Sequence, residues 1–273
     1  MAERTGVFIL VTNDDGVDSP GLRAAVQCVL DLGEVWVAAP RQQQSGLSRS
    51  HPAGRVSVTE GMMEMDHTQV PTFAFDASPA SAVRHGILRF LPRTPDLAIS
   101  GINYGENIGA ATTVSGTVGA AIEAACFGVP TLAASLETDR KYHFSQSSEV
   151  DFRAAASFVR RFARWVLDHG MPKGVDILRL DVPAEATPDT PWRVTRVSRQ
   201  QYFISPVILD AQGKKHLRPY VTEFDAHTLE PDSDVRAFAI DRMVAVSPLT
   251  IDLTAKVNLR SLQQRIARGL PGQ

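Results

Sequence analysis

The stretch VFILVTNDDGVDSPGL, residues 7–22, joins a run of apolar residues directly to two adjacent acidic residues and then to the start of a helix. Residues 6–11 are apolar and rich in β-branched side chains, which is typical of a strand buried on both faces of a parallel sheet. Ser19 is a suitable N-cap, Pro20 fits the first helical turn, and Gly33 ends the apolar pattern. The stretch predicts the first half of a β-α-β unit.

The same alternation of strands and helices continues over the first 180 residues. Helices are expected at residues 116–127 and 151–169, and further strand candidates are residues 34–40, 96–100, 131–135 and 176–182. This order predicts an α/β fold with a doubly wound, mostly parallel, Rossmann-like sheet, whose ligands bind beyond the carboxyl ends of the strands. The length of 273 residues suits one large domain, so we expect a single domain over residues 1–273.

The C-terminal part has a different pattern. Residues 192–224 are β-prone and are broken by DAQGKK at residues 210–215, which predicts a protruding hairpin arm. A late strand candidate lies within residues 242–255, and apolar spacing predicts a terminal helix over residues 254–270. A long hairpin that has no obvious packing partner in its own chain often packs against another subunit. We therefore expect the arm and the terminal helix to serve assembly as a homodimer or homotetramer.

Composition limits the class of partner and the location. The formal charge of −2 argues against a groove that neutralises many phosphates, so we expect no nucleic-acid duplex as a partner. The apolar run before the two acids is too short for a signal-peptide core, and Glu123 interrupts the Ala-rich stretch after Ser115, so no membrane span is expected. The only two cysteines lie in apolar helical patterns. These observations predict a soluble, cytoplasmic protein.

Two interpretations of Asp14 and Asp15 are open from the residues alone. Asn-Asp-Asp-Gly is ordinary turn chemistry, because Asn and Asp hydrogen-bond their own backbone and Gly accepts positive φ. A cation bound between the two carboxylates would instead remove the repulsion between adjacent like charges.

Polar loops follow three of the predicted strands, at the same edge of the sheet. They are TNDDG at residues 12–16, PRQQQSGLS at residues 40–48 and GINYGENIG at residues 101–109. Together they offer the two adjacent carboxylates of Asp14 and Asp15, hydroxyls and amide oxygens, without Cys or His. These hard oxygen ligands suit Mg²⁺, Mn²⁺ or Ca²⁺ rather than zinc.

Five ordered blocks carry a resemblance to a known family: TNDDGVDSPG, APRQQQSG, SGINYGENIG, SGTVGAA and VSPLTIDLTA. Over nearly its whole length the chain resembles the SurE family, the survival-protein-E nucleotidases. The resemblance implies a divalent-metal-dependent phosphatase that hydrolyses nucleoside 5'-monophosphates, with 3'-monophosphates as further candidates. It also implies one divalent ion per subunit, Mg²⁺ or Mn²⁺ first and Ca²⁺ second. The implied ligands are Asp14, Asp15, Ser45 and Asn103, and the two acids are the implied catalytic residues.

The substrate phosphate is expected at the start of the helix that ends near Phe127. Ser115, Gly116 and Thr117 open this helix, and free backbone N–H groups at a helix start bind anions. Gly116 would let a phosphate approach the backbone closely. Asn107 resembles the second Asn of the family's loop and could donate to the same phosphate oxygens. A bound dication would neutralise those oxygens and activate a water for in-line attack.

Three different functions compete with a metal-dependent nucleotidase. A haloacid-dehalogenase-like phosphatase would require a D-x-D-G order, whereas Asp14 and Asp15 are adjacent. A general phosphomonoesterase and a catalytically silent nucleotide-binding stress protein would both share the same fold and loops.

The chain also departs from the family pattern at two places. Residues 77–82 lack the family's usual Asp-Cys pair, and Glu106 stands where a Pro is common. Neither change affects an implied metal ligand, but either could alter substrate preference.

Overall fold

The computed structural model describes residues 6–217 and 219–270. In this part of the chain, nine strands form one central sheet in the order β3-β4-β2-β1-β5-β6-β7-β13-β8. Their bounds are β1 Phe8–Thr12, β2 Glu34–Pro40, β3 Val58–Met65, β4 Thr68–Phe75, β5 Leu97–Tyr104, β6 Thr131–Leu136, β7 Ile177–Val182, β8 Trp192–Val194 and β13 Val244–Leu249. The strands from β4 to β7 are parallel, and β3 and β13 pair antiparallel with β4 and β7.

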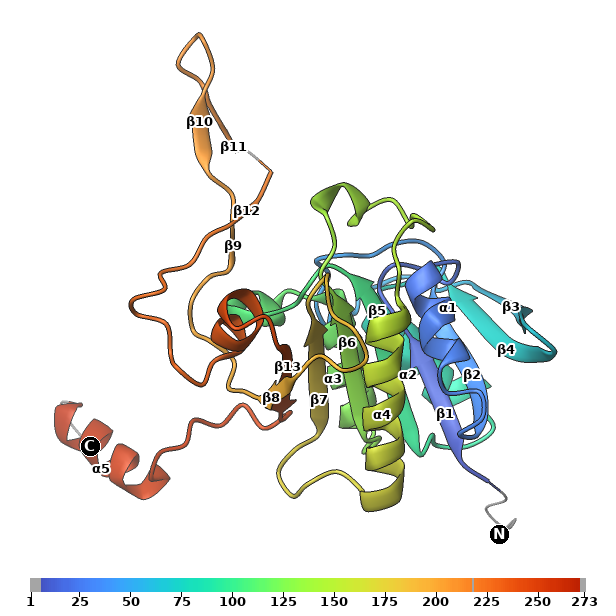
Figure 1. The fold of residues 1–273 in the computed structure, drawn as a ribbon. Coiled ribbons are helices and arrows are strands. Elements are labelled where there is room, and N and C mark those ends of the chain that lie inside the picture. The colour runs from blue at the N-terminus through green and yellow to red at the C-terminus, as the bar shows by residue number, and fades with distance from the viewer. Residues whose placement is uncertain (1–5, 218, 271–273) are drawn as a thin grey trace.

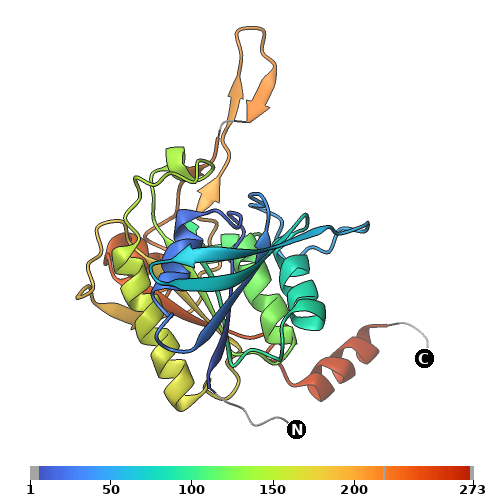
Figure 2. The same cartoon turned by 90° about the vertical axis from the view of Figure 1, so that its right-hand side faces the viewer.

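Helices cover both faces of the sheet (Figures 1 and 2). Helices α1 (Pro20–Gln27) and α4 (Arg153–His169) lie on one face, and α2 (Pro79–His85) and α3 (Gly116–Cys126) lie on the other. Strand β1 is buried along its whole length because Ile9 and Val11 join the core under α1 and α4, while Leu10 joins the core under α2 and α3. The expected doubly wound α/β fold is confirmed.

Short helical turns fill several connections. They are η1 (Gly86–Phe90), η2 (Gly109–Thr113), η3 (Arg140–Tyr142) and η4 (Arg236–Ile240). Within the described residues no helix is both long enough and apolar enough to cross a membrane.

Some boundaries differ from the sequence-based expectation. Strands β3 and β4 form an antiparallel hairpin that the sequence pattern does not predict, because the edge strand β3 is mostly exposed and lacks a buried run. Strand β5 continues past Ser100 to Tyr104 after an irregularity in its pairing with β6. Asn103 therefore lies in a strand rather than in the following loop.

The C-terminal part forms the expected arm and terminal helix. In the arm, β9 (Phe203–Ile204) pairs with β12 (Val221–Thr222), and β10 (Val207–Leu209) pairs with β11 (Lys215–Leu217), both antiparallel. The arm begins later than predicted, since Trp192–Val194 joins the central sheet as β8. It rises at the same end as the carboxyl ends of the parallel strands (Figure 1).

Helix α5 (Leu259–Gly269) starts five residues after the expected position, where the side chain of Asn258 accepts a hydrogen bond from the Ser261 amide at 2.9 Å. None of its residues is buried, and it extends away from the sheet (Figures 1 and 2).

Candidate active site

The three polar loops meet where the direction of winding reverses. Strand β1 lies between β2 and β5, so the connection after β1 leads to one side and the rest of the parallel strands lie on the other. In doubly wound sheets this position leaves a crevice at the carboxyl ends of the strands. The loop after β1 is closed by Asn13, whose amide donates to the Gly16 carbonyl at 2.9 Å and whose Oδ1 accepts from the Gly16 amide.

Asn13 and Gly16 close this turn without the side chains of Asp14 and Asp15. Gly16 has φ +103°, a conformation that favours glycine, and Asn13 supplies the side-chain hydrogen bonds of the turn. Asp14 and Asp15 are therefore not needed to close the loop, and their carboxylates take part in other contacts.

Asp14 faces the start of α3. Its Oδ1 accepts a hydrogen bond from the hydroxyl of Thr117 at 2.5 Å, and its backbone carbonyl accepts from the Gln44 amide at 2.7 Å. A Cβ at Gly116 would lie 2.6 Å from Oδ2 of Asp14. Gly116 thus makes room for this carboxylate, a tighter requirement than the expected room for a phosphate.

Asp15 lies behind Asp14 and does not line the cavity described below. Its Oδ2 accepts from the Tyr104 amide at 3.2 Å, and its Oδ1 accepts from the side-chain amide of Gln43 at 3.0 Å. The carboxylate is held by groups from the loop after β2 and from β5.

Gln43 is a site residue that the sequence pattern does not single out. Its Nε2 lies 3.0 Å from Asp15 Oδ1, 3.0 Å from Ser45 Oγ and 2.6 Å from the carbonyl of His143. Because the amide has two hydrogens, these three acceptors share them. Gln43 ties Asp15, the Ser45 loop and the segment around His143 together.

The side-chain amide of Asn103 is oriented by two neighbouring backbone carbonyls. Its side-chain amide nitrogen donates to the carbonyl of Gly105 at 2.6 Å, and more weakly to that of Tyr104 at 3.3 Å. This orientation leaves Oδ1 as the atom directed to a ligand. Ser45 and Asn103 line the same cavity as Asp14.

The electrostatics of the two acids fit a bound cation. Burial raises the pKa of Asp14 above its ordinary value, while the Thr117 hydroxyl lowers it. Burial raises the pKa of Asp15 well above its ordinary range, and the adjacent Asp14 raises it further. A nearby positive charge would favour both carboxylates in their ionised form. The oxygen atoms of these acids, of Ser45 and of Asn103 are of the kind that Mg²⁺, Mn²⁺ and Ca²⁺ prefer.

Helix α3 begins beside these acids. The Oγ of Ser115 accepts from the Val118 amide at 3.2 Å and so caps the helix, and Ser115 and Gly116 both line the cavity. Thr117 is fully buried, and its hydroxyl is engaged by Asp14. Its side chain therefore acts on the acid rather than on a phosphate.

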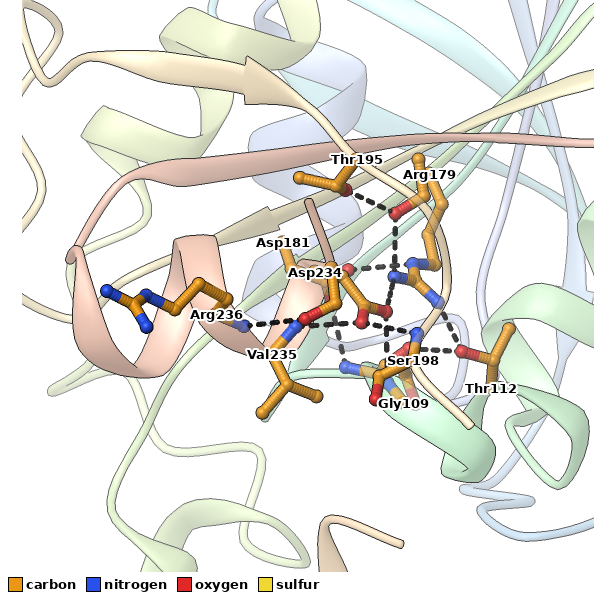
Figure 3. A network of polar contacts seen from close by, with 12 residues as sticks. Gly109, Thr112, Arg179, Asp181, Thr195, Ser198, Asp234, Val235 and Arg236 are labelled. Atoms are coloured by element: carbon orange, nitrogen blue, oxygen red, sulfur yellow. Dashed lines mark hydrogen bonds and ion pairs between the residues drawn. The ribbon is translucent and has the colours of Figure 1, made fainter. Parts of the chain in front are cut away.

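Asn107 is held by a network of polar contacts around Arg179, Asp181 and Asp234, and Figure 3 shows these three residues. Its backbone amide donates to Asp181 Oδ1 at 2.8 Å, and its side-chain amide donates to Ser135 Oγ at 2.8 Å. Asp181 lies 2.8 Å from Nε of Arg179, which also donates to Asp234. Asp234 in turn accepts from the Gly109 amide at 3.0 Å.

Every charged member of this network is fully buried: Arg179, Asp181 and Asp234. Buried ion pairs gain little net stability over apolar packing, but removal of one partner leaves an uncompensated charge and is strongly destabilising. The network therefore fixes one arrangement of residues 107–112, with the side chain of Asn107 at the cavity wall.

The cavity at these loops has a volume of about 430 Å³. Its polar lining residues include Asp14, Asn103, Asn107, Ser115 and Gly116. Its wall also contains the aromatic side chains of Phe144, Phe203 and Tyr220, together with His143. Phe203 and Tyr220 belong to the base of the arm, so the arm completes the cavity wall. Nothing in the local sequence around these aromatic residues indicated this role.

The segment around His143 contacts both the loop after β1 and the arm. The ring of His143 hydrogen-bonds the Tyr220 hydroxyl through Nδ1, and burial lowers the pKa of His143. Gln146 donates to the backbone carbonyl of Asp15, and the Tyr104 hydroxyl donates to the Ser147 carbonyl at 2.8 Å.

Residues 77–82, which depart from the family pattern, do not line the cavity. Ser78 donates to the carbonyl of Ser50, and Ser81 lies 3.1 Å from Nδ1 of His51. This stretch supports the loop after β2. Glu123 of α3 secures the same loop, since its buried carboxylate pairs with Arg49 and also with Arg84, each at 2.7 Å.

The chain is similar to known proteins over nearly its whole length. A family model described as survival protein SurE matches residues 9–203. A 5'-nucleotidase SurE of Methanothrix thermoacetophila is 45% identical over 259 residues, which cover 92% of this chain and 95% of that protein. A 5'-nucleotidase SurE of Thermococcus gammatolerans is 40% identical over 262 residues, covering 93% and 94%. The crystal structure of a SurE protein from Aquifex aeolicus is 29% identical and superposes with a TM-score of 0.75, covering 95% of this chain and 99% of that one.

Proposed function

The chain belongs to the SurE family, and from this membership we propose that it is a divalent-metal-dependent 5'-nucleotidase that hydrolyses nucleoside monophosphates to nucleoside and phosphate. The observation that carries the proposal is the position of Asp14, a buried carboxylate that lies against the start of α3 and lines the cavity.

The metal would be held by Asp14, Asp15, Ser45 and Asn103. Mg²⁺ or Mn²⁺ fits this set best, and Ca²⁺ ranks after them. When bound, a divalent ion lowers the pKa of a coordinated water and neutralises charge on phosphate oxygens. The neutral donors Ser45 and Asn103 add no negative charge, so the site keeps a positive character toward an anionic substrate.

The chain's own residues would bind and orient the substrate. The first turn of α3 at Ser115 and Gly116 supports negative charge on the phosphate through its N–H groups. Asn107 has a second amide hydrogen beyond the one given to Ser135, and this hydrogen is available to a phosphate oxygen. Thr117 holds Asp14 in place through its hydroxyl. The nucleoside would occupy the part of the cavity that Phe203 and Phe144 line.

We further propose that the enzyme is a homodimer or homotetramer assembled through the arm and α5. The arm exposes Val207, Leu209 and Leu217, at 59%, 63% and 71% of their surface. Helix α5 exposes an apolar row that consists of Leu259, Leu262, Ile266 and Leu270. Contiguous exposed apolar surface of this kind is typical of an interface.

We place the proposed activity in the cytoplasm. Cys28 and Cys126 are both free thiols. Free thiols suit a reducing compartment.

Release of inorganic phosphate tests the proposal. The purified protein is stripped with EDTA and assayed with AMP, GMP, 3'-AMP, p-nitrophenyl phosphate and bis-p-nitrophenyl phosphate, with Mn²⁺, Mg²⁺, Ca²⁺ or no metal. Activity on nucleoside 5'-monophosphates only after metal is restored is expected, with modest base preference. Full activity in the stripped state would contradict metal dependence. Activity on p-nitrophenyl phosphate alone would identify a general phosphomonoesterase, and preference for the diester would contradict the proposed site.

A further inference from the structure

His143 lines the cavity, yet the proposed chemistry leaves it without a role. It directly follows η3 and is only 9% exposed. Its ring packs on the backbone of Gly105, because a Cβ at that position would lie 2.8 Å from the Cε1 and Nε2 atoms of the ring. Gly105 stands between Asn103 and Asn107 in the chain. The ring therefore occupies a fixed place beside the loop after β5.

Both ring nitrogens of His143 have a partner. Nε2 lies 3.2 Å from the Thr138 carbonyl, which can only accept a hydrogen bond, so this nitrogen carries the hydrogen. Nδ1 of the neutral ring is then an acceptor, and it receives the hydrogen of the Tyr220 hydroxyl. Burial lowers the pKa of His143, which favours this neutral form. With both nitrogens engaged, His143 holds Tyr220 in place and has no free nitrogen for proton exchange with a substrate.

Tyr220 connects His143 with the aromatic part of the cavity wall. Its ring is stacked on the imidazole, with ring centroids 5.9 Å apart, and it meets the ring of Phe203 edge-on at 5.2 Å. Tyr220 and Phe203 both line the cavity. Arg140 donates to the backbone carbonyl of Tyr220, so the chain of the arm is tied to η3 independently of the His143 ring. The His143 side chain therefore orients the Tyr220 ring, and with it the packing of Phe203.

We propose that His143 is a positioning residue for nucleotide binding, because its Nδ1 holds the Tyr220 hydroxyl so that Tyr220 and Phe203 are pre-oriented to receive the nucleoside. This inference rests on the proposed nucleotidase function. Side chains that are already ordered lose less freedom when a ligand binds, so the contact should strengthen binding of the nucleoside. Since the contact lies outside the proposed metal ligands, binding of phosphate alone should not depend on it.

The test measures kcat and KM for AMP, and the inhibition constant of inorganic phosphate, in variants that keep one ring nitrogen or neither. Asn places an acceptor oxygen close to the position of Nδ1, whereas Gln places a polar atom close to that of Nε2. His143→Gln and His143→Ala should each raise KM by about fivefold, the effect of one lost hydrogen bond, with little change in kcat. His143→Asn should stay close to the wild type. The inhibition constant of phosphate should be unchanged in all three variants.

Tyr220→Phe removes the other partner of the same hydrogen bond and should also raise KM by about fivefold. Combining it with His143→Ala should raise KM no further, whereas independent contributions would multiply to about 25-fold. Tyr142→Phe is the matched control, because it removes the hydroxyl of the neighbouring tyrosine, which donates to Glu149 at 2.6 Å, and neither residue lines the cavity. It should keep the wild-type KM.

Equal KM values in His143→Asn and His143→Gln would overturn the inference, as would multiplied effects in the double variant. A rise in the phosphate inhibition constant that matches the rise in KM would also overturn it and assign the effect to the phosphate site. If His143→Ala does not fold, the Asn and Gln variants and Tyr220→Phe decide the question. Failure of the nucleotidase proposal is distinguishable, since the wild type would then release no phosphate from AMP.

Discussion

The loop after β1 and the arm depart from ordinary protein surfaces in opposite ways. The loop buries two adjacent carboxylates, Asp14 and Asp15, which are 3% and 1% exposed. The arm exposes apolar side chains such as Leu217. Buried like charges and exposed apolar area are both unfavourable for a chain on its own. Under the proposals made above, each region would be complementary to something outside the chain: a cation in the loop, and a second copy of the chain at the arm.

The strongest test of the loop removes one carboxylate. Asp14→Asn should lower kcat/KM for AMP at limiting Mn²⁺ by about 10³-fold, as expected when one electrostatic group is lost from a pre-organised site. The metal-free variant should melt no earlier than the metal-free wild type, because a buried charge beside Asp15 has been removed. Phosphate release and thermal unfolding measure the two effects.

Asp18→Asn is the matched control, since Asp18 lies on the same loop but is exposed. It should retain wild-type kinetics. Wild-type turnover of Asp14→Asn at limiting metal would show that Asp14 holds no metal.

The corresponding test of the arm adds charge to its apolar face. Leu209 pairs with Lys215, and Val207 pairs with Leu217, so Leu209 and Leu217 share one face of the hairpin. Leu209→Asp combined with Leu217→Asp should weaken self-association by about 100-fold, from the lost burial of two Leu side chains. Light scattering over a range of concentrations measures this effect.

Gln212→Asp adds charge at the exposed, polar tip of the same hairpin and should leave association unchanged. If the double variant associates as tightly as the wild type, the apolar face of the arm is not the interface.

A smaller effect is expected from the hydroxyl that orients Asp14. Thr117→Val removes the donor to Asp14 Oδ1 while keeping the shape of the side chain. The affinity for Mn²⁺ should fall by about 10-fold or more, as seen for groups that orient metal ligands. Titration of the metal-free protein by calorimetry measures the affinity. Thr117→Ser retains the hydroxyl and should bind Mn²⁺ nearly as tightly as the wild type; equal weakening in both variants would point to packing instead.

The last prediction concerns the effect of Glu106 on the pH dependence of stability. The pKa of Glu106 is about 7 in the folded protein, above its ordinary value of 4.5. The folded form thus keeps a proton that the unfolded chain releases, so this contribution to stability is fully present below pH 4.5 and is lost as the pH rises through 7. The free energy of unfolding of the wild type, relative to Glu106→Gln, should fall by at most about 1.4 kcal/mol per pH unit over this window. Urea unfolding in EDTA between pH 5 and pH 8 measures it, and a constant difference would contradict the raised pKa.

The sequence was informative wherever a local pattern decided the structure. The strand before Asn13, the start of α3 at Ser115 and the arm were predictable because apolar runs, capping residues and turn residues lie close together in the chain. The edge strand β3 was not, because exposed strands lack a clear alternation. Residues such as Gln43 and Asp234 were also missed. Their roles depend on partners far away in the sequence, and no local pattern records such a pair.

The hydrogen bond from the Gly109 amide to Asp234 spans 125 positions of the chain. The ribosome synthesises the polypeptide from its N-terminus. The loop after β1 and helix α3 therefore emerge long before Asp234 does. A nascent chain that ends before residue 234 has its two carboxylates and its helix start but lacks the acceptor that holds Gly109, and with it part of the support for the Asn107 loop. The order of synthesis therefore makes the loop at residues 107–112 one of the last parts of the molecule to be completed.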